Sequence, residues 1–208
     1  MRLRGMTTIS FLLLGLAIAA PAANANDSEH HSPKKQASNS AKACMSTPGF
    51  VKEAAQGGMA EVELGQLAVQ RAQDPDIKQF AQRMIDDHAR ANAALKQLAQ
   101  QKKWKLPTDM SSKQKMIYNS LHDKAGADFD REYAKMMVED HDHDLKMFEA
   151  YSEHGKDADV KTFASSTVPT LRDHQQMARS NASKLGVSLA SYATTDRDTY
   201  DKDTVAQK

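Results

Sequence analysis

Five polar side chains could form a metal site inside this protein, because each falls on the inward face of a helix that the sequence predicts. Imidazole and carboxylate groups are common ligands of zinc, copper and iron in proteins. Burying such a group without a partner costs several kcal/mol, so each one needs either a hydrogen-bonding partner or a cation. The five candidates are Glu61, His88, His141, Asp144 and His174.

Helical periodicity is the reason for placing these residues inside. With about 100° per residue, His88 and His174 each continue the apolar stripe of their own segment. Asp144 falls at the centre of a third stripe, with Asp140 and His141 on its two flanks, and at least one of these is expected to be buried. Glu61 follows a stripe of small residues on the first segment. The pattern therefore predicts that four separate helices each direct an imidazole or a carboxylate toward one common axis.

A second interpretation of the same residues needs no metal. A histidine in a protein core is usually satisfied by a hydrogen bond to a carboxylate or to a backbone carbonyl. Such a network would fix the register of the helices in a non-enzymatic structural or adaptor bundle. Both interpretations stay open on the sequence alone, and the relative heights of His88, His141 and His174 along the bundle distinguish them.

Four long amphipathic helices and one short helix are expected to position these side chains. No segment shows the sustained alternation of a strand, and long amphipathic helices bury their stripes most simply against one another. The sequence therefore predicts an all-α four-helix bundle with a crossover segment that carries a short extra helix. The long helices are expected at 47–72, 75–102, 128–153 and 158–185, and the short one at 111–121. Gly126 is expected to end the short helix, and Pro169 to kink the last one.

The first residues are typical of a cleavable secretory signal. Arg2 and Arg4 precede an apolar run over 9–20, and the small-residue signature Ala23-Asn24-Ala25 follows. We expect export across the inner membrane to the periplasm. No later segment approaches the roughly 20 apolar residues that a membrane span needs. The predicted organisation is a signal at 1–25, a disordered arm at 26–45, the bundle at 46–186 and a flexible tail at 187–208.

Composition narrows the classes of partner. The formal net charge is +1, and basic and acidic residues are interspersed. Nucleic acid is not expected as a partner, because its recognition relies on a basic face that neutralises phosphates. Cys44 is the only cysteine, so an intramolecular disulfide is excluded. A protein partner or a homo-oligomer is compatible with the sequence.

Several motifs resemble an exported bacterial family catalogued as domain of unknown function 4142. They are Phe50-Val51, the run Gly-Gly-Met-Ala-Glu-Val-Glu-Leu-Gly at 57–65, Asp87-His88, its counterpart Asp140-His141, and the segment 171–174. The resemblance covers roughly 50–185. That family is regarded as ferritin-like, so the resemblance implies a four-helix bundle with a crossover, and it implies no established activity.

The chain departs from the ligand pattern of ferritin-like di-iron proteins. Those proteins carry Glu-x-x-His on two of their helices. Here the residues three positions before the histidines cannot ligate a metal, since they are Ile85, Val138 and Leu171. A di-iron oxidase or ferroxidase is therefore not expected, and an enzymatic role is not favoured. The remaining hypothesis is one divalent zinc, iron or copper ion, in metal handling or stress protection. Up to three imidazoles and one carboxylate, either Glu61 or Asp144, would hold it.

Overall fold

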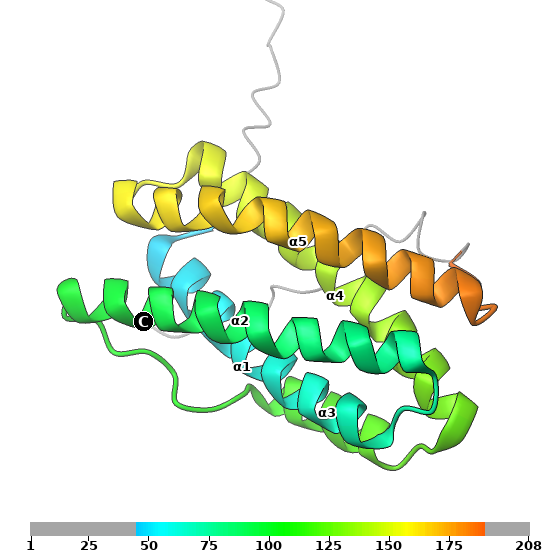
Figure 1. Cartoon of the computed structure of the whole chain (residues 1–208). Helices are drawn as coiled ribbons and strands as arrows, with labels where there is room; N and C mark the ends of the chain where they lie inside the picture. The colour runs from blue at the N-terminus through cyan, green and yellow to red at the C-terminus, as the bar shows by residue number, and fades with distance from the viewer. Residues whose placement is uncertain (1–44, 190–208) are drawn as a thin grey trace, which may run out of the picture. The chain divides into compact units, whose positions relative to one another are not determined.

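The computed structural model describes residues 45–189, which form five α-helices and no strand (Figure 1). This confirms the all-α class and the short extra helix between the second and third long ones. The predicted signal at 1–25, nearly all of the arm, and the tail beyond residue 189 lie outside the described residues. The helices are α1 (Thr47–Arg71), α2 (Pro75–Gln101), α3 (Ser112–His122), α4 (Gly126–His154) and α5 (Ala158–Lys184).

The long helices pair as two hairpins, α1 with α2 and α4 with α5, and α2 also packs on α5 (Figure 1). Short polar caps begin the second helix of each hairpin. Asp74 accepts hydrogen bonds from the backbone N–H groups of Asp76 and Ile77 at the start of α2. At the start of α5, Asp157 accepts the equivalent pair from the second and third residues of that helix. Each cap satisfies donors that have no partner inside the helix. The sharp reversals between paired helices follow from these caps.

Two glycines on α1 allow close approach to α2. A Cβ at Gly65 would lie 2.9 Å from Ile85 Cγ1 and 3.0 Å from the Ala81 carbonyl oxygen, and a Cβ at Gly58 would collide with Asn92. Only glycine fits such a contact without displacing its neighbour. The two contacts also set the register of the antiparallel pair.

Gly126 begins α4, so the prediction that it ends the short helix was wrong. The short helix α3 ends at His122, and Asp123 is its C-cap. Gly126 adopts a φ of +60°, directly after the extended Ala125. The positive φ that favours glycine is therefore used to turn the chain into the next helix, not to leave the previous one.

The histidines lie between two apolar clusters of the core. One cluster includes Phe80, Phe129 and Tyr133, and the other includes Phe50 and Tyr151. On α2, α4 and α5 alike, the buried histidine falls between residues of the first cluster and residues of the second. A polar layer thus separates two apolar ones at one level of the bundle. No helix in the range 45–189 is long and apolar enough to cross a lipid bilayer.

Candidate metal centre

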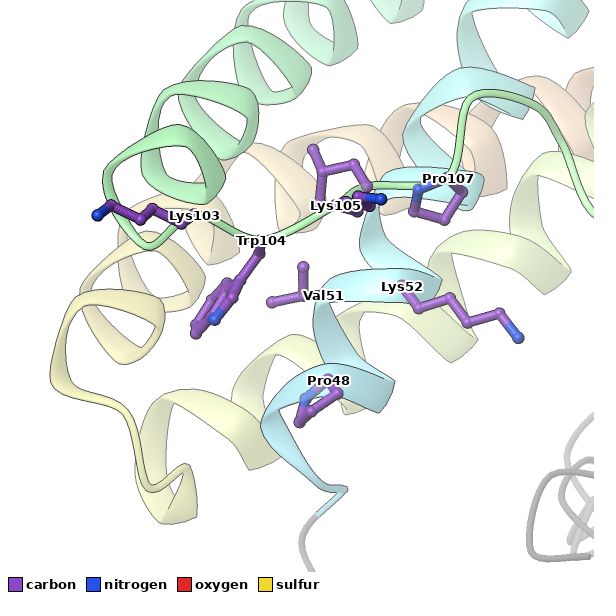
Figure 2. A pocket seen from close by; sticks show the side chains of 8 residues that line it. Pro48, Val51, Lys52, Lys103, Trp104, Lys105 and Pro107 are labelled. Carbon is purple, nitrogen blue, oxygen red and sulfur yellow. The ribbon is translucent and has the colours of Figure 1, made fainter. Parts of the chain in front are cut away.

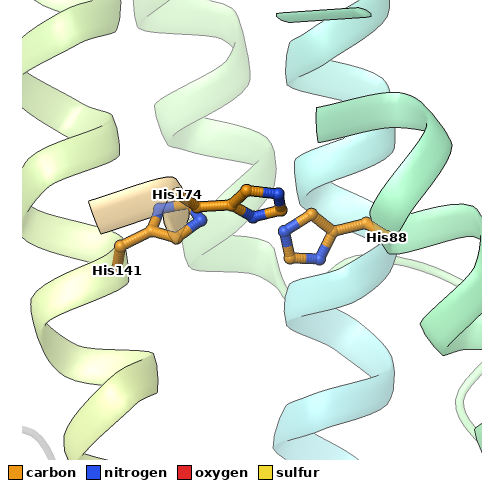
Figure 3. A group of neighbouring side chains, drawn as sticks. All are labelled: His88, His141 and His174. Atoms are coloured by element: carbon orange, nitrogen blue, oxygen red, sulfur yellow. The ribbon is translucent and has the colours of Figure 1, made fainter. Parts of the chain in front are cut away.

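Three imidazoles from three helices meet inside the bundle (Figure 3). The ring centroids of His88 and His141 are 5.8 Å apart, those of His88 and His174 5.3 Å, and those of His141 and His174 5.4 Å. One nitrogen of each ring lies within 4.8 Å of the chosen nitrogens of the other two. All three residues are buried, with at most 7% of their surface exposed. The structure therefore brings together three of the five predicted site residues.

The outer nitrogens of two rings are held by the protein. His141 Nδ1 lies 2.9 Å from the carbonyl oxygen of Met137, and His174 Nε2 lies 2.8 Å from Asp87 Oδ2. Because these oxygens only accept, the ring N–H of each histidine donates to them. The nitrogen on the other side of each neutral ring then carries a lone pair.

Three of the four remaining ring nitrogens are buried and have no hydrogen-bond partner. They are His88 Nε2, His141 Nε2 and His174 Nδ1. In metalloproteins, a ligating histidine donates its other N–H to a carboxylate or to a backbone carbonyl, which fixes the ring and its tautomer. His141 and His174 both have this arrangement before any ion is considered.

Burial keeps the three rings neutral near pH 7. It lowers the pKa of His88 well below its ordinary value, and the neighbouring rings lower it further. Burial likewise lowers the pKa of His141 to about 4. The pKa of His174 is lowered by burial too, although the hydrogen bond and charge of Asp87 oppose the change. Neutral imidazole is the form that binds a metal ion, so no proton has to leave first.

Asp87 contacts the histidine group, and the sequence prediction did not include it. Burial alone would raise its pKa, but the hydrogen bonds from His174 and Arg83 and the charge of Arg90 outweigh burial and lower it. Arg83 Nε lies 3.3 Å from the carboxylate, and Arg90 also contacts it. Asp87 is therefore an ionised acceptor that orients the His174 ring. Its only signal in the sequence is its place directly before His88, at the edge of the apolar stripe.

Glu61 points inward as predicted, but its surroundings are acidic. The residue is fully buried, and the Asp140 side chain lies near enough to share a hydrogen bond with its carboxyl group. Burial raises its pKa well above the ordinary value, and the nearby Asp140 and Asp144 raise it further. On α1, Glu61 stands between Gly58 and Gly65. These glycines contact α2 on either side of His88, so Glu61 and His88 lie at one level of the bundle. Within 45–189, the group of mutually close ligand atoms contains the three histidines and not Glu61.

Asp144 lies on the seam between α1 and α4. The residue as a whole is half-buried. Burial of its carboxyl group nevertheless raises the pKa of that group well above the ordinary value, and the charge of Asp140 raises it further. Its Oδ2 would lie 3.8 Å from a Cβ at Gly57. Along the same seam, His143 Nε2 lies 2.7 Å from Glu53 Oε1. Asp144 is thus near Glu61 and is not part of the imidazole group, and its role as a ligand stays a prediction.

Comparison with known proteins places the chain in a family and a fold. The model of the family described as Domain of unknown function (DUF4142) matches residues 32–180. None of the curated proteins is a significant relative of this sequence.

Several solved structures share the helical fold at low sequence identity. CopM in its Cu(II)-bound form has a TM-score of 0.59 and 17% identity, covering 68% of this chain and 99% of CopM. A DUF305 protein from Streptomyces coelicolor has a TM-score of 0.58 and 14% identity, covering 67% of this chain and 91% of its own. A DUF305 fragment from Deinococcus radiodurans has a TM-score of 0.56 and 14% identity, covering 66% and 93% respectively. At such identities the likeness concerns the fold alone.

Proposed function

The chain belongs to the DUF4142 family, and on that premise we propose that its bundle binds one divalent transition-metal ion between His88, His141 and His174. The observation that carries this proposal is the close approach of three buried imidazoles, one nitrogen of each within 4.8 Å of the others, in a layer where three ring nitrogens have no hydrogen-bond partner. A polar atom that is buried and unpaired is costly. A cation shared by the three would satisfy them all at once.

The separation of the nitrogens suits an ion after a small contraction. A tetrahedral zinc ion with Zn–N bonds of about 2.0–2.1 Å places its ligand nitrogens about 3.4 Å apart. The ring nitrogens lie within 4.8 Å of one another, so each pair would have to close by at most about 1.4 Å. Rotation of imidazoles about their side-chain torsions supplies movements of this size. Imidazole ligands favour zinc, copper and iron over magnesium or calcium.

A carboxylate is the natural fourth ligand. Three neutral imidazoles leave the charge of a divalent ion uncompensated, and Glu61 is a fully buried carboxyl group at the level of His88. We assign Glu61 to that role. Asp144 is a second carboxylate near the site. Binding of a cation would stabilise the ionised form of Glu61, which burial alone disfavours. The proposed ligand set is therefore Glu61, His88, His141 and His174, with Asp144 beside them.

The proposed role is handling of a metal outside the cytoplasm, or protection from its toxicity. The signal predicted at 1–25 supports export to the periplasm, and the Streptomyces coelicolor relative is described as secreted. Because CopM has been solved with Cu(II), copper is the first ion to test, followed by zinc and iron. The absence of Glu-x-x-His pairs argues against a di-iron oxidase.

The rival function is a structural or adaptor bundle without metal. The hydrogen bonds of His174 to Asp87 and of His141 to Met137 favour it, because they satisfy one nitrogen of each ring by protein groups alone. In that case the histidine layer would fix the register of the helices. The three inner nitrogens would then stay unpaired in the folded protein, which makes this the second candidate.

Titration of metal-free mature protein with zinc and Cu(II) tests the proposal. We expect one ion per chain by calorimetry and native mass spectrometry, and loss of that ion in His88→Phe, His141→Phe and His174→Phe. The matched controls are His122→Gln and His154→Gln, which change side chains that are 50% and 61% exposed. His30 and His31 should be replaced by glutamine throughout, because they could bind metal independently. Binding that is absent, or that survives His174→Phe, would contradict the proposal.

A further inference from the structure

A hollow with an apolar floor lies at the opposite end of α2 from its N-cap, between the first turns of α1 and the segment that follows α2 (Figure 2). Its volume is about 460 Å³, within the range of sites that hold small molecules. Figure 2 shows Trp104, Val51 and Pro48 around the same space. The apolar lining residues are Pro48, Val51, Trp104, Leu106 and Pro107. None of them belongs to the histidine layer, so this hollow is distinct from the proposed metal centre.

Three lysines surround this apolar floor. Lys52 on α1 and Lys103 and Lys105 after α2 all line the hollow and are exposed. Figure 2 shows Lys52 and Lys103 extending from opposite sides of it. In the part of the chain that the structure describes, none of the three forms an ion pair. The adjacent Lys102 contrasts with them, because Asp157 and Asp159 each lie 2.7 Å from its amine. The rim thus carries three lysines without a direct ion pair, beside the Lys102 amine, which lies 5.5 Å from the centre of the Trp104 ring and holds two carboxylates there.

Lys103 occupies a backbone position that favours glycine. Its φ is 57°, the only positive φ of a non-glycine residue among those described. The N–H of Trp104 bonds to the Ala99 carbonyl at 2.8 Å and that of Lys103 to the Gln100 carbonyl at 3.1 Å, which is the helix ending that usually carries glycine at this place. A lysine there strains the backbone, and it adds a cation to the rim.

We propose that this hollow binds a small amphipathic anion, with its carboxylate or phosphate among Lys52, Lys103 and Lys105 and its apolar body against Trp104. Apolar surface in the hollow favours a hydrocarbon or aromatic body, because burying it releases water. Three unpaired cations attract the opposite charge and disfavour a cationic ligand. The proposal is independent of the metal centre, and either can fail without the other.

Trp104 makes the test direct, because it is the only tryptophan in the chain. Its fluorescence therefore reports on this hollow alone. We expect decanoate, below its micelle-forming concentration, to change the emission in a saturable way. Decyltrimethylammonium and decanol, which share the apolar chain, should bind at least about tenfold more weakly. Added sodium chloride should weaken decanoate binding, since screening affects exposed charges most.

Variants separate a role in binding from a role in folding. Lys52→Gln and Lys105→Gln should each weaken decanoate binding about fivefold, and Lys78→Gln, an exposed lysine near the start of α2, should not. Lys103→Gly is the sharpest variant, because it relieves the positive φ and removes the charge. We expect it to raise the melting temperature and yet to weaken decanoate binding about fivefold. A more stable protein that binds less well excludes unfolding as the cause.

The source of the anion is tested in a second arm. Vesicles that contain phosphatidylglycerol are compared with free decanoate and with decyl phosphate. Saturable binding of either free amphiphile supports the proposal. Co-sedimentation with vesicles, without a saturable response to the free amphiphiles, would overturn it in favour of a membrane surface. Equal responses to decanoate and decyltrimethylammonium, or binding that is unchanged in Lys103→Gly and Lys105→Gln, would also overturn it.

Discussion

Lowering the pH should destabilise the metal-free protein through His141. In the folded state burial lowers the pKa of His141 from 6.5 to about 4. In the unfolded chain the ring titrates with its ordinary pKa. Between those two values the unfolded state binds a proton that the folded state does not, so stability is lost as the pH falls. Above pH 6.5 the ring is neutral in both states, and this contribution is then fully present.

The size of the effect follows from the difference between the two pKa values. The difference between 6.5 and about 4, at about 1.36 kcal/mol per pKa unit, gives a loss of about 3 kcal/mol across that window. A domain of this size is typically stable by only about 5–15 kcal/mol. His141 alone can therefore remove a large share of the stability, and His88, whose pKa is also lowered, adds a loss of the same sign.

Urea denaturation of the metal-free protein, followed by circular dichroism at a series of pH values from about 7.5 to about 4, measures this contribution. The comparison is between the unchanged protein and His141→Phe, which has no group to titrate. As the pH falls through this window, the free energy of unfolding should decrease in both proteins. We expect the decrease to be about 3 kcal/mol smaller in the variant than in the unchanged protein. The exposed His154→Gln is the control, and it should follow the unchanged protein. Identical pH dependence for the unchanged protein and His141→Phe would show that His141 does not titrate in this window.

Three further predictions concern the neighbours of the site and the rim of the hollow. Asp87→Asn should weaken zinc or copper binding by about 10–100-fold in calorimetric titration, because it loosens the orientation of His174; affinity equal to that of the unchanged protein would mean that the carboxylate does not position the ring. Glu61→Gln should stabilise the metal-free protein above pH 4.5. The pKa of Glu61 is 4.5 in the unfolded chain and higher in the folded protein, so the folded protein loses stability as the pH rises between these two pKa values. That gain should vanish below pH 4.5 in urea denaturation, and a gain that is constant with pH would contradict the assignment. Lys103→Gly should stabilise the fold by about 1 kcal/mol in the same assay, whereas Lys103→Ala should not, since only glycine adopts the positive φ without strain.

The histidine layer explains how the site is built into the fold. His88, His141 and His174 each lie between the two apolar clusters on their own helix. The packing of those clusters holds the three helices in place on either side of the polar layer. The imidazoles are therefore positioned by core packing and not by a flexible loop, and an ion would bind to a largely preformed set of ligands.

Helix boundaries and the inward direction of the histidines could be predicted because they depend on local signals. Asp74-Pro75 marks the start of α2, and a stripe repeating at the helical period determines which way His88 and His174 point. Such signals need only the few residues around each position. Gly126 is a case where the local signal was not sufficient. A glycine with a positive φ can follow the end of one helix or begin the next, and the sequence does not say which.

The partners of the site could not be predicted because they depend on how different helices pack. Asp87 falls at the edge of its own stripe, and only the approach of α2 to α5 brings it to His174. The acidic surroundings of Glu61 similarly depend on α4, which carries Asp140 and Asp144. Periodicity gives the direction of a side chain but not the rotation and height of the neighbouring helix. Five residues were thus predicted to point inward, and three of them lie in one group.

The nature of the first coordination shell is the most direct test of the proposed centre. X-ray absorption spectroscopy of the zinc-loaded or copper-loaded protein, with His30 and His31 replaced by glutamine, counts the imidazole ligands around the ion. We expect about three imidazole nitrogens at about 2.0 Å, together with an oxygen ligand, and a lower nitrogen count in His174→Phe. A shell of oxygens only, or the same spectrum from His174→Phe, would exclude the proposed centre.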